Sequence, residues 1–164
     1  MDYLKVGKIV NTHGIKGELR LLSNFKYKNK VFKNNFKIYI GKEKDMEVIN
    51  SYRVHKMFDM ITLKGYSNIN EVLKYKGKLV FIDKNDLVLN KDEYLDEDLI
   101  GFDVIYEDIS NLKVVEIVNY PNNKLLKVRS NDIDNLVPFS LVEKIELDNN
   151  KIYIKDIKGL IKWR

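Results

Sequence analysis

Short segments in which apolar and polar residues alternate run along most of this sequence, and turn-forming residues separate them. In one such segment Phe36, Ile38 and Ile40 alternate with Lys37 and Tyr39. Because successive side chains of a strand point to opposite sides, this period of two predicts strands with one buried face. Gly, Asn and Pro between the segments favour turns. The pattern therefore predicts an all-β protein.

The first half predicts a six-stranded barrel with one short helix. A glycine-containing connection, residues 11–17, joins the first two expected strands. Asn68 can cap a helix whose third position is Glu71 and which ends before Gly77. Closure into a barrel would leave no exposed sheet edge. Strands are expected at residues 3–10, 18–22, 36–40, 48–54, 60–63 and 79–82.

A polar and increasingly acidic segment, residues 83–98, indicates a change of domain. We place an N-terminal barrel domain at residues 1–84, a linker at 85–92 and a second barrel domain at 93–164. Residues 141–147 fit either a strand or a helical turn. The expected architecture is two small β-barrels joined by a short linker. Strands of the second barrel are expected at residues 99–106, 114–118, 125–129, 136–139 and 151–154.

Composition limits the surroundings in which such a chain works. The sequence has no cysteine, which excludes a disulfide framework and a thiolate zinc site. No segment approaches the roughly 20 apolar residues that span a bilayer, and the first residues lack the apolar core of a signal peptide. We therefore expect a cytoplasmic protein that is not attached to a membrane.

The two halves of the chain differ in charge. Residues 1–90 contain 18 Lys and Arg against 9 Asp and Glu, whereas residues 91–164 contain 11 against 15. The first half is therefore basic and the second acidic, within a chain whose net charge is +5. Such a split predicts two surfaces with different partners, one suited to phosphates and one suited to a basic protein.

No residue pattern indicates catalysis. His13 and His55 are the only histidines, and they fall in different expected elements. Gly7, Gly14 and Gly17 match neither phosphate-loop spacing, and a strand follows where a helix would be needed. We therefore expect no enzyme, no metal and no cofactor.

A basic segment interleaved with aromatic residues, residues 26–37, allows two interpretations. Its lysines, Lys28 and Lys30 among them, could contact phosphates while Tyr27, Phe32 and Phe36 stack on bases. Alternatively, the aromatic side chains enter the core and the lysines are only solvated. The sequence leaves both open.

Several motifs resemble the RimM family of ribosome maturation factors. Residues 6–20, which include the run from His13 to Glu18 (HGIKGE), resemble the family's opening, and Gly65 with the helix from Asn68 resembles a later block. The second half resembles its PRC-barrel domain: Tyr94 with residues 98–101 matches the motif at the domain's entry, and residues 125–128, 136–139 and 159–161 match later segments. The resemblance covers nearly the whole chain.

The resemblance implies a non-enzymatic assembly factor. RimM proteins bind free small ribosomal subunits, help mature the head and process rRNA, and contact the nineteenth protein of the small subunit beside small-subunit rRNA. Read onto this sequence, the protein contact falls on Tyr94, Leu95 and Asp98, with Leu95 where many relatives have a second tyrosine. A monomer is expected.

The RNA contact is expected in the basic half. His13, Lys16 and Arg20 are the first candidates, because a long hairpin loop would present their donors, and Lys28 and Lys30 are further candidates. Gly14 and Gly17 are expected to shape the turn. Two rival functions stay open: a generic RNA-binding double barrel, and a flavin- or nucleotide-binding barrel enzyme.

Overall fold

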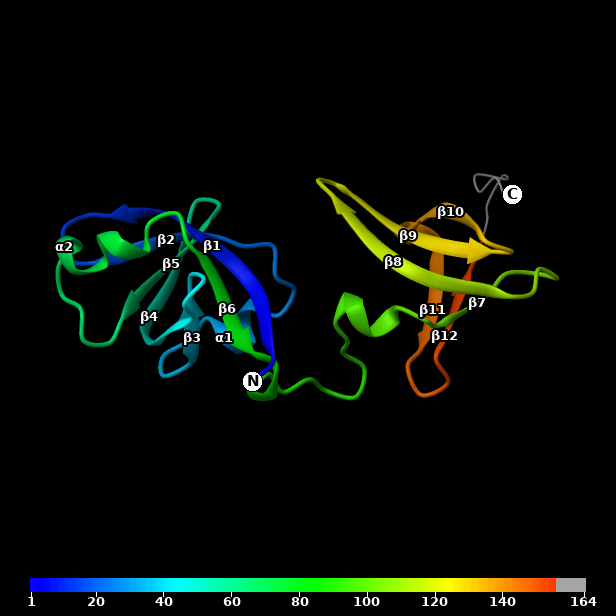
Figure 1. The fold of residues 1–164 in the computed structure, drawn as a ribbon, viewed down its shortest axis with the longest axis horizontal. Helices are drawn as coiled ribbons and strands as arrows, with labels where there is room; N and C mark the ends of the chain where they lie inside the picture. The colour runs from blue at the N-terminus through cyan, green and yellow to red at the C-terminus, as the bar shows by residue number, and fades with distance from the viewer. Residues whose placement is uncertain (156–164) are drawn as a thin grey trace. The chain divides into compact units, whose positions relative to one another are not determined.

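The protein is described here by a computed structural model that places residues 1–155. The chain divides into two compact units between Val88 and Leu89, within the segment expected to be a linker (Figure 1). Each unit is built around one β-sheet, and the helices are single turns. The expectation of an all-β protein is confirmed.

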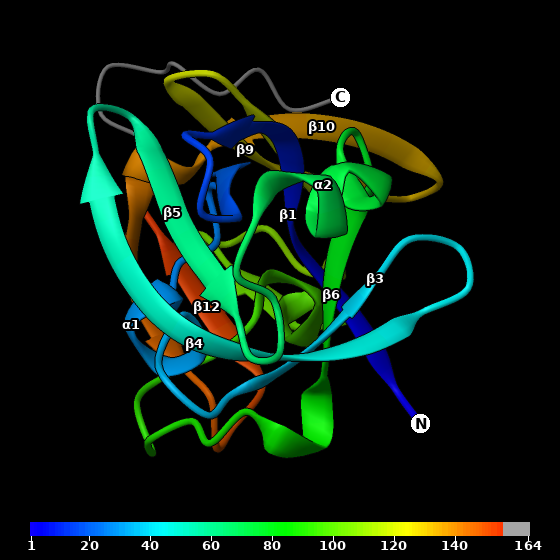
Figure 2. The same ribbon diagram turned by 90° about the vertical axis from the view of Figure 1, so that its left-hand side faces the viewer.

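The first unit is a closed six-stranded barrel (Figure 2). The strand order around the barrel is β1-β2-β5-β4-β3-β6, and every neighbouring pair is antiparallel. A single-turn helix α2 and a 3₁₀ turn η1 precede the last strand, as expected. The elements are β1 (Tyr3–His13), β2 (Glu18–Leu22), β3 (Lys37–Ile40), β4 (Asp45–His55), β5 (Phe58–Leu63), α2 (Ile69–Val72), η1 (Leu73–Tyr75) and β6 (Leu79–Asp83).

Strand alternation explains the barrel's interior. Ile38 and Ile40 of β3 are fully buried in the core, and Val80 and Ile82 of β6 join them there. The residues between them, such as Tyr39, therefore point to the outer face. Burial of these branched aliphatic side chains supplies the main driving force for closing the barrel.

The connection between β1 and β2 is tighter than expected. β1 continues to His13 and β2 begins at Glu18, and these two residues pair with each other. The turn is therefore residues 14–17 rather than a long loop from residue 11. A β-bulge between Ile9 and Asn11 absorbs a change of register, which the sequence pattern does not reveal.

An additional single-turn helix, α1 (Lys28–Val31), lies in the basic aromatic segment. Tyr27 is 5% exposed and Phe32 is 2% exposed, and Phe36 packs against the core. Two of these rings cannot stack on bases in this conformation, so burial favours the core interpretation of the aromatic residues.

The second unit holds a six-stranded sheet of order β10-β9-β8-β7-β12-β11. β12 and β7 are parallel, and the other neighbours are antiparallel. The described pairing runs from β10 to β11 without returning, so PRC-barrel closure stays a prediction. The strands are β7 (Asp103–Ile105), β8 (Leu112–Tyr120), β9 (Asn123–Ser130), β10 (Ile133–Pro138), β11 (Val142–Glu146) and β12 (Lys151–Ile154).

One expected strand of the second unit differs from the structure, and one segment that the sequence left open is resolved. The strand expected from residue 99 to 106 is reduced to β7, because the 3₁₀ helix η3 (Asp96–Leu99) occupies its beginning. The ambiguous segment 141–147 contains the end of the turn η4 (Phe139–Leu141) and the strand β11. The motif at residues 159–161 lies outside the described residues. In the part of the chain that is described, no helix is long and apolar enough to cross a membrane.

Candidate binding surfaces

The outer wall formed by β2, β5 and β4 gathers basic side chains. Arg20 of β2 and Arg53 of β4 both pair with Met60 of β5, and paired residues share a face of the sheet. Met60 alternates with the core residue Ile61, so this shared face is the outer one. We call the following set the basic face: His13, Lys16, Arg20, Arg53, His55 and Lys56.

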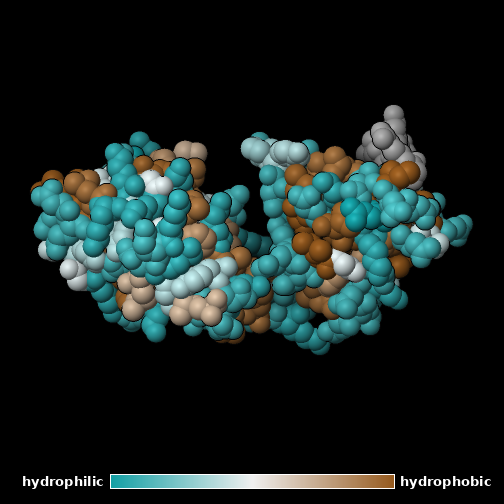
Figure 3. All heavy atoms as spheres, in the orientation of Figure 1, coloured by the Kyte–Doolittle hydropathy of each residue, from teal (hydrophilic) through white to brown (hydrophobic). Residues whose placement is uncertain are grey.

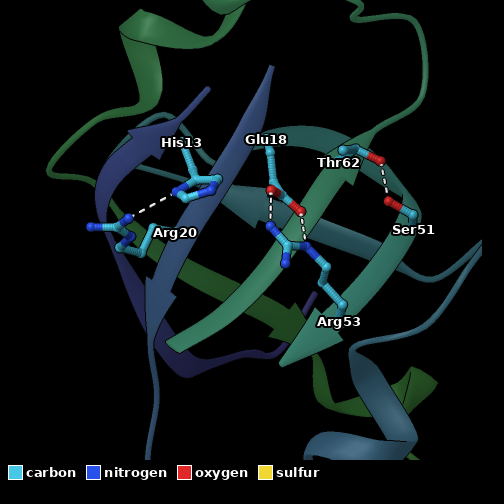
Figure 4. Close-up of polar contacts among 6 residues, drawn as sticks. All are labelled: His13, Glu18, Arg20, Ser51, Arg53 and Thr62. Carbon is cyan, nitrogen blue, oxygen red and sulfur yellow. Dashed lines mark hydrogen bonds and ion pairs between the residues drawn. The ribbon is translucent and has the colours of Figure 1, made fainter. Parts of the chain in front are cut away.

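Arg20 and His13 are joined across β1 and β2 (Figure 4). A guanidinium nitrogen of Arg20 lies 2.8 Å from Nδ1 of His13. Because a guanidinium can only donate, Nδ1 must accept, and the neutral ring carries its proton on Nε2. The Arg20 guanidinium also lies 5.0 Å from the centre of the Phe58 ring. Arg20 is thus held in place by a strand neighbour and an aromatic face.

Glu18, the first residue of β2, is an acidic residue in contact with the basic face. It accepts two hydrogen bonds from Arg53, of 2.8 and 2.7 Å (Figure 4). The hydrogen bond from Arg53 lowers the pKa of Glu18, and burial opposes the shift. The Arg53 side chain is still 49% exposed. Arg53 can therefore meet an anion without leaving Glu18.

The environment of His55 shows the sign of the potential on this face. Its ring lies 5.4 Å from that of His13. The pKa of His55 is lowered, first because burial disfavours the charged ring and then because the positive charges of Arg53, Lys56 and Arg20 lie around it. A negatively charged ligand would relieve that repulsion.

The turn between β1 and β2 is braced against the start of α2. The amide of Ile69 donates to the carbonyl of Ile15 over 2.9 Å. Gly17 has φ of 92°, and a Cβ there would lie 3.2 Å from the carbonyl oxygen of Asn68. The turn is therefore fixed while Lys16 at its tip stays exposed.

The structure brings together three of the five RNA candidates. Lys16 lies on the turn, and His13 and Arg20 lie on strands. The sequence analysis missed Arg53, His55 and Lys56, which reach the same face only through the pairing of β4 with β5 and of β5 with β2. The signal for two of them was available, because residues two apart in a strand point to the same face of the sheet, as Arg53 and His55 do in β4.

Lys28 and Lys30 lie elsewhere and are already engaged. Lys28 Nζ is 2.8 Å from a carboxylate oxygen of Asp59, whose side chain is only 3% exposed. Lys30 Nζ donates to the carbonyl of Val88 over 2.9 Å. The ion pair gives Lys28 a structural role, and the replacement Lys28→Glu would set two carboxylates against each other.

The second unit places its candidate residues around η3. Leu95 is only 9% exposed, and Asp98 accepts a 2.8 Å hydrogen bond from the Leu95 amide. Both residues shape the backbone at the start of η3. Tyr94 differs, because it lines a cavity of about 360 Å³. We call this the acidic cavity; its lining residues are Lys91, Asp92, Tyr94, Ile145, Glu146, Leu147, Asp148 and Asn149.

Apolar side chains also reach the surface of the second unit. Figure 3 shows brown spheres gathered on its viewed face, where the first unit is mostly teal. Ile100 is 51% exposed and Tyr120 is 57% exposed. Carboxylates beside exposed apolar residues suit a partner protein that carries basic side chains. Among residues 1–155 no group of three His, Cys, Asp or Glu residues could hold a metal ion.

These features define the class of the protein: a two-unit all-β protein with a basic face on one unit and an acidic cavity on the other. Residues 4–87 match the model of the RimM N-terminal domain. Ribosome maturation factor RimM from Ligilactobacillus salivarius is 39% identical, covering 98% of this chain and 99% of the relative, and its namesake from Bacillus cereus strain G9842 is 33% identical, covering 97% and 98%. The chain belongs to the RimM family of ribosome maturation factors.

Two solved structures were also similar. A RimM structure from Pseudomonas aeruginosa covers 97% of this chain and 100% of its own with 19% identity and a TM-score of 0.43. The solution structure of the RimM N-terminal domain from Thermus thermophilus covers 54% of this chain and 98% of its own with 16% identity and a TM-score of 0.47.

Proposed function

We propose that this ribosome maturation factor acts as a cytoplasmic, monomeric assembly chaperone for the head of the small ribosomal subunit. In this proposal the first barrel binds small-subunit rRNA through the basic face, and the second unit binds the basic nineteenth small-subunit protein. The protein joins two components of a free, unfinished subunit and assists rRNA processing without catalysis of its own.

The observation that carries the RNA contact is the convergence of basic side chains on one wall. Three strands supply His13, Arg20, Arg53 and His55, and two turns add Lys16 and Lys56. Of these, Arg53 is paired with the carboxylate of Glu18. Phosphate contacts by lysine and arginine release counterions from RNA, so binding through this face should weaken steeply with salt.

The two exposed turn lysines, Lys16 and Lys56, give the sharpest test. Replacing them leaves the bond from Arg20 to His13 and the bonds from Arg53 to Glu18 intact. In the variant Lys16→Gln/Lys56→Gln, affinity for small-subunit rRNA should fall, and the slope of log affinity against log salt should fall by up to about 1.8, or 0.9 per lost phosphate contact. The measurement is binding by fluorescence anisotropy across a salt series.

A matched control is Lys37→Gln/Lys76→Gln, which removes the same charge from exposed positions away from the basic face. Its salt slope should stay at the wild-type value. An unchanged slope in the turn variant would reject the basic face as the RNA contact. Equal affinity for unrelated RNA would instead favour a generic RNA-binding protein.

The protein contact rests on the acidic cavity and on Tyr94 within it. Asp92 and Asp148 are exposed at its rim, and Glu146 lines it from β11. A Lys or Arg side chain of a partner can place its apolar stem on the Tyr94 ring and its charge among these carboxylates. Leu95 contributes by holding the backbone that presents Tyr94.

Replacement of the rim carboxylates tests this contact without disturbing packing. Asp92→Asn/Asp148→Asn should reduce capture of the nineteenth small-subunit protein, and Tyr94→Ala should do the same. Asp108→Asn/Asp132→Asn is the control, because both residues are exposed acidic positions on other turns of the same unit. Undiminished capture by both cavity variants would refute the assignment.

A further inference from the structure

A second cavity lies on the wall of the first barrel opposite β5 in the strand order. Its volume is about 350 Å³, and it lies between the turn after β3 and the beginning of β6. None of its lining residues belongs to the basic face. We call it the β3–β6 cavity; its lining residues are Gly41, Lys42, Glu43, Lys44, Gly77, Lys78, Leu79 and Phe81.

The backbone holds this cavity in a defined shape. The amide of Gly41 donates to the carbonyl of Leu79 over 2.9 Å, which ties the β3 turn to β6. Gly41 has φ of 77°, and a Cβ there would lie 3.0 Å from Cδ of Lys78. Lys44 has φ of 54°, which is uncommon for a residue other than glycine. The turn therefore directs lysines toward the cavity at some conformational cost.

The floor of the cavity is apolar and aromatic. Phe81 points outward because its neighbours Val80 and Ile82 are in the core, and it is only half-buried. Leu79 is 37% exposed beside it. Tyr3 packs against Phe81 and Tyr39 with ring centres 6.4 and 5.2 Å apart. In Figure 3 pale and brown spheres interrupt the teal surface of the first unit near the place where Figure 1 labels β3 and β6.

The rim of the cavity carries an excess of positive charge. Lys42, Lys44 and Lys78 line it against the single carboxylate of Glu43. Within residues 1–155 none of the three lysines forms an ion pair. Lys44 Nζ lies 4.3 Å from the centre of the Phe81 ring, so one ammonium group is positioned directly at the aromatic floor.

We propose that the β3–β6 cavity binds a nucleotide of single-stranded RNA, with the base against Phe81 and Leu79 and the flanking phosphates at Lys42, Lys44 and Lys78. An apolar aromatic floor beside ammonium groups is the combination by which proteins hold single strands. The inference rests on the proposed function in taking RNA as the partner of this barrel. It adds a second contact on the opposite wall, so that one barrel bridges two RNA segments.

An acidic peptide is the other anionic occupant to consider. Its carboxylates could meet the lysines, but the aromatic floor would then contribute only general apolar contact. A nucleotide uses both features: its flat base would take the place of the Lys44 ammonium over the ring, and its phosphates would then meet that ammonium beside it.

The test uses the full chain and a photoreactive oligoadenylate hexamer, with an abasic hexamer of equal charge and hexaglutamate as comparisons. Cross-links to the segments around Tyr3, Lys44 and Phe81, located by mass spectrometry, are expected. Lys42→Gln/Lys78→Gln should lower the salt slope of hexamer binding by about 1.4, or 0.7 per phosphate on a single strand. Phe81→Leu should reduce the preference for oligoadenylate over the abasic hexamer about tenfold.

Two further variants separate this inference from the proposed function. Lys16→Gln/Lys56→Gln should leave cross-linking at the β3–β6 cavity unchanged, and Lys37→Gln should change nothing. Cross-links confined to the basic face would overturn the contact at the β3–β6 cavity alone. If instead only the cavity variants lose RNA binding and the basic-face variant binds like the wild type, only the contact at the basic face would be overturned. Absence of RNA binding anywhere would overturn both, and hexaglutamate binding as tight as oligoadenylate would overturn RNA as the occupant.

Discussion

At the scale of single residues, Asp59 shows how a charged group is accommodated inside the first barrel. It is 2% exposed, accepts a 2.6 Å hydrogen bond from the Tyr52 hydroxyl, and forms an ion pair with Lys28. A buried carboxylate that loses its cation retains its desolvation penalty without compensation. Lys28 therefore fastens α1 to β5 and is not simply a surface charge.

Removal of that cation should destabilise the first barrel. We expect Lys28→Met to lower the free energy of unfolding by about 1–3 kcal/mol, because Asp59 would keep only its bond to Tyr52. Urea denaturation measures the change. Lys37→Met, at an exposed position, is the control and should stay within about 0.5 kcal/mol of the wild type. Equal stability of the two variants would show that the ion pair contributes nothing.

Tyr52 makes the stability sensitive to alkaline pH. Burial, and then its hydrogen bond to Asp59, raise the pKa of Tyr52 from 10.0 to about 12. A raised pKa in the folded state stabilises the protein fully below pH 10, and that stabilisation is lost as the pH rises from 10 to about 12. Wild-type protein should therefore lose stability over this range more steeply than Tyr52→Phe. Parallel curves from denaturant titrations would contradict this assignment.

Residue patterns in the sequence predict which face of a strand a side chain occupies better than they predict which distant residue it contacts. Alternation in β3 correctly separated Ile38 and Ile40 from the outward Lys37, because a period of two is local information. The bond from Lys28 to Asp59 is not local, since it depends on how α1 folds back onto β5. Composition suggested an RNA-contacting lysine there; the structure shows that this lysine forms an ion pair, and its RNA contact stays a prediction.

At the scale of elements, the turn between β1 and β2 depends on its packing against α2. Gly17 combines a positive φ with close approach to the Asn68 backbone, whereas Gly14 has a positive φ with open space around it. Asn68 and Glu71 cap α2 reciprocally, which fixes the backbone that Gly17 approaches. The turn and the helix are therefore one structural unit.

Alanine replacements at these two glycines should separate backbone strain from steric contact. Gly14→Ala should cost about 1–2 kcal/mol from the left-handed backbone alone. Gly17→Ala should cost more, because its new Cβ would also press on the carbonyl of Asn68. Thermal unfolding of both variants measures the difference. A smaller effect at Gly17 than at Gly14 would show that the close approach is easily relieved.

The sequence predicted most elements but not their ends. Strand content and the capped helix at Asn68 could be predicted because each has a local signature. The extension of β1 to His13 could not, because pairing with β2 decides it. Likewise, η3 replaces the beginning of an expected strand where the Asp98 carboxylate holds the Leu95 amide.

At the scale of the whole molecule, the charge split of the sequence corresponds to two separately folded units. The division at Val88 and Leu89 lies close to where the net charge changes sign. Charge alone predicted that a basic surface would exist, but the identity of its residues required the strand order of a closed barrel. Arg20 and Arg53 are distant in sequence and adjacent to the same β5 residue.

Two surfaces on separate units should contribute independently to binding a particle that contains both partners. Free energies of binding add when the altered sites are distant and share no contacts, usually within about 0.5 kcal/mol. Loss of affinity in Lys16→Gln/Lys56→Gln should therefore add to the loss in Asp92→Asn/Asp148→Asn.

The most direct test is the affinity of the wild type, the two paired variants and their combination for purified free small ribosomal subunits. The account predicts that each pair weakens binding and that the combined variant shows the sum of the two free-energy losses. Wild-type affinity in all three correctly folded variants would contradict it, as would a combined loss no larger than that of one pair.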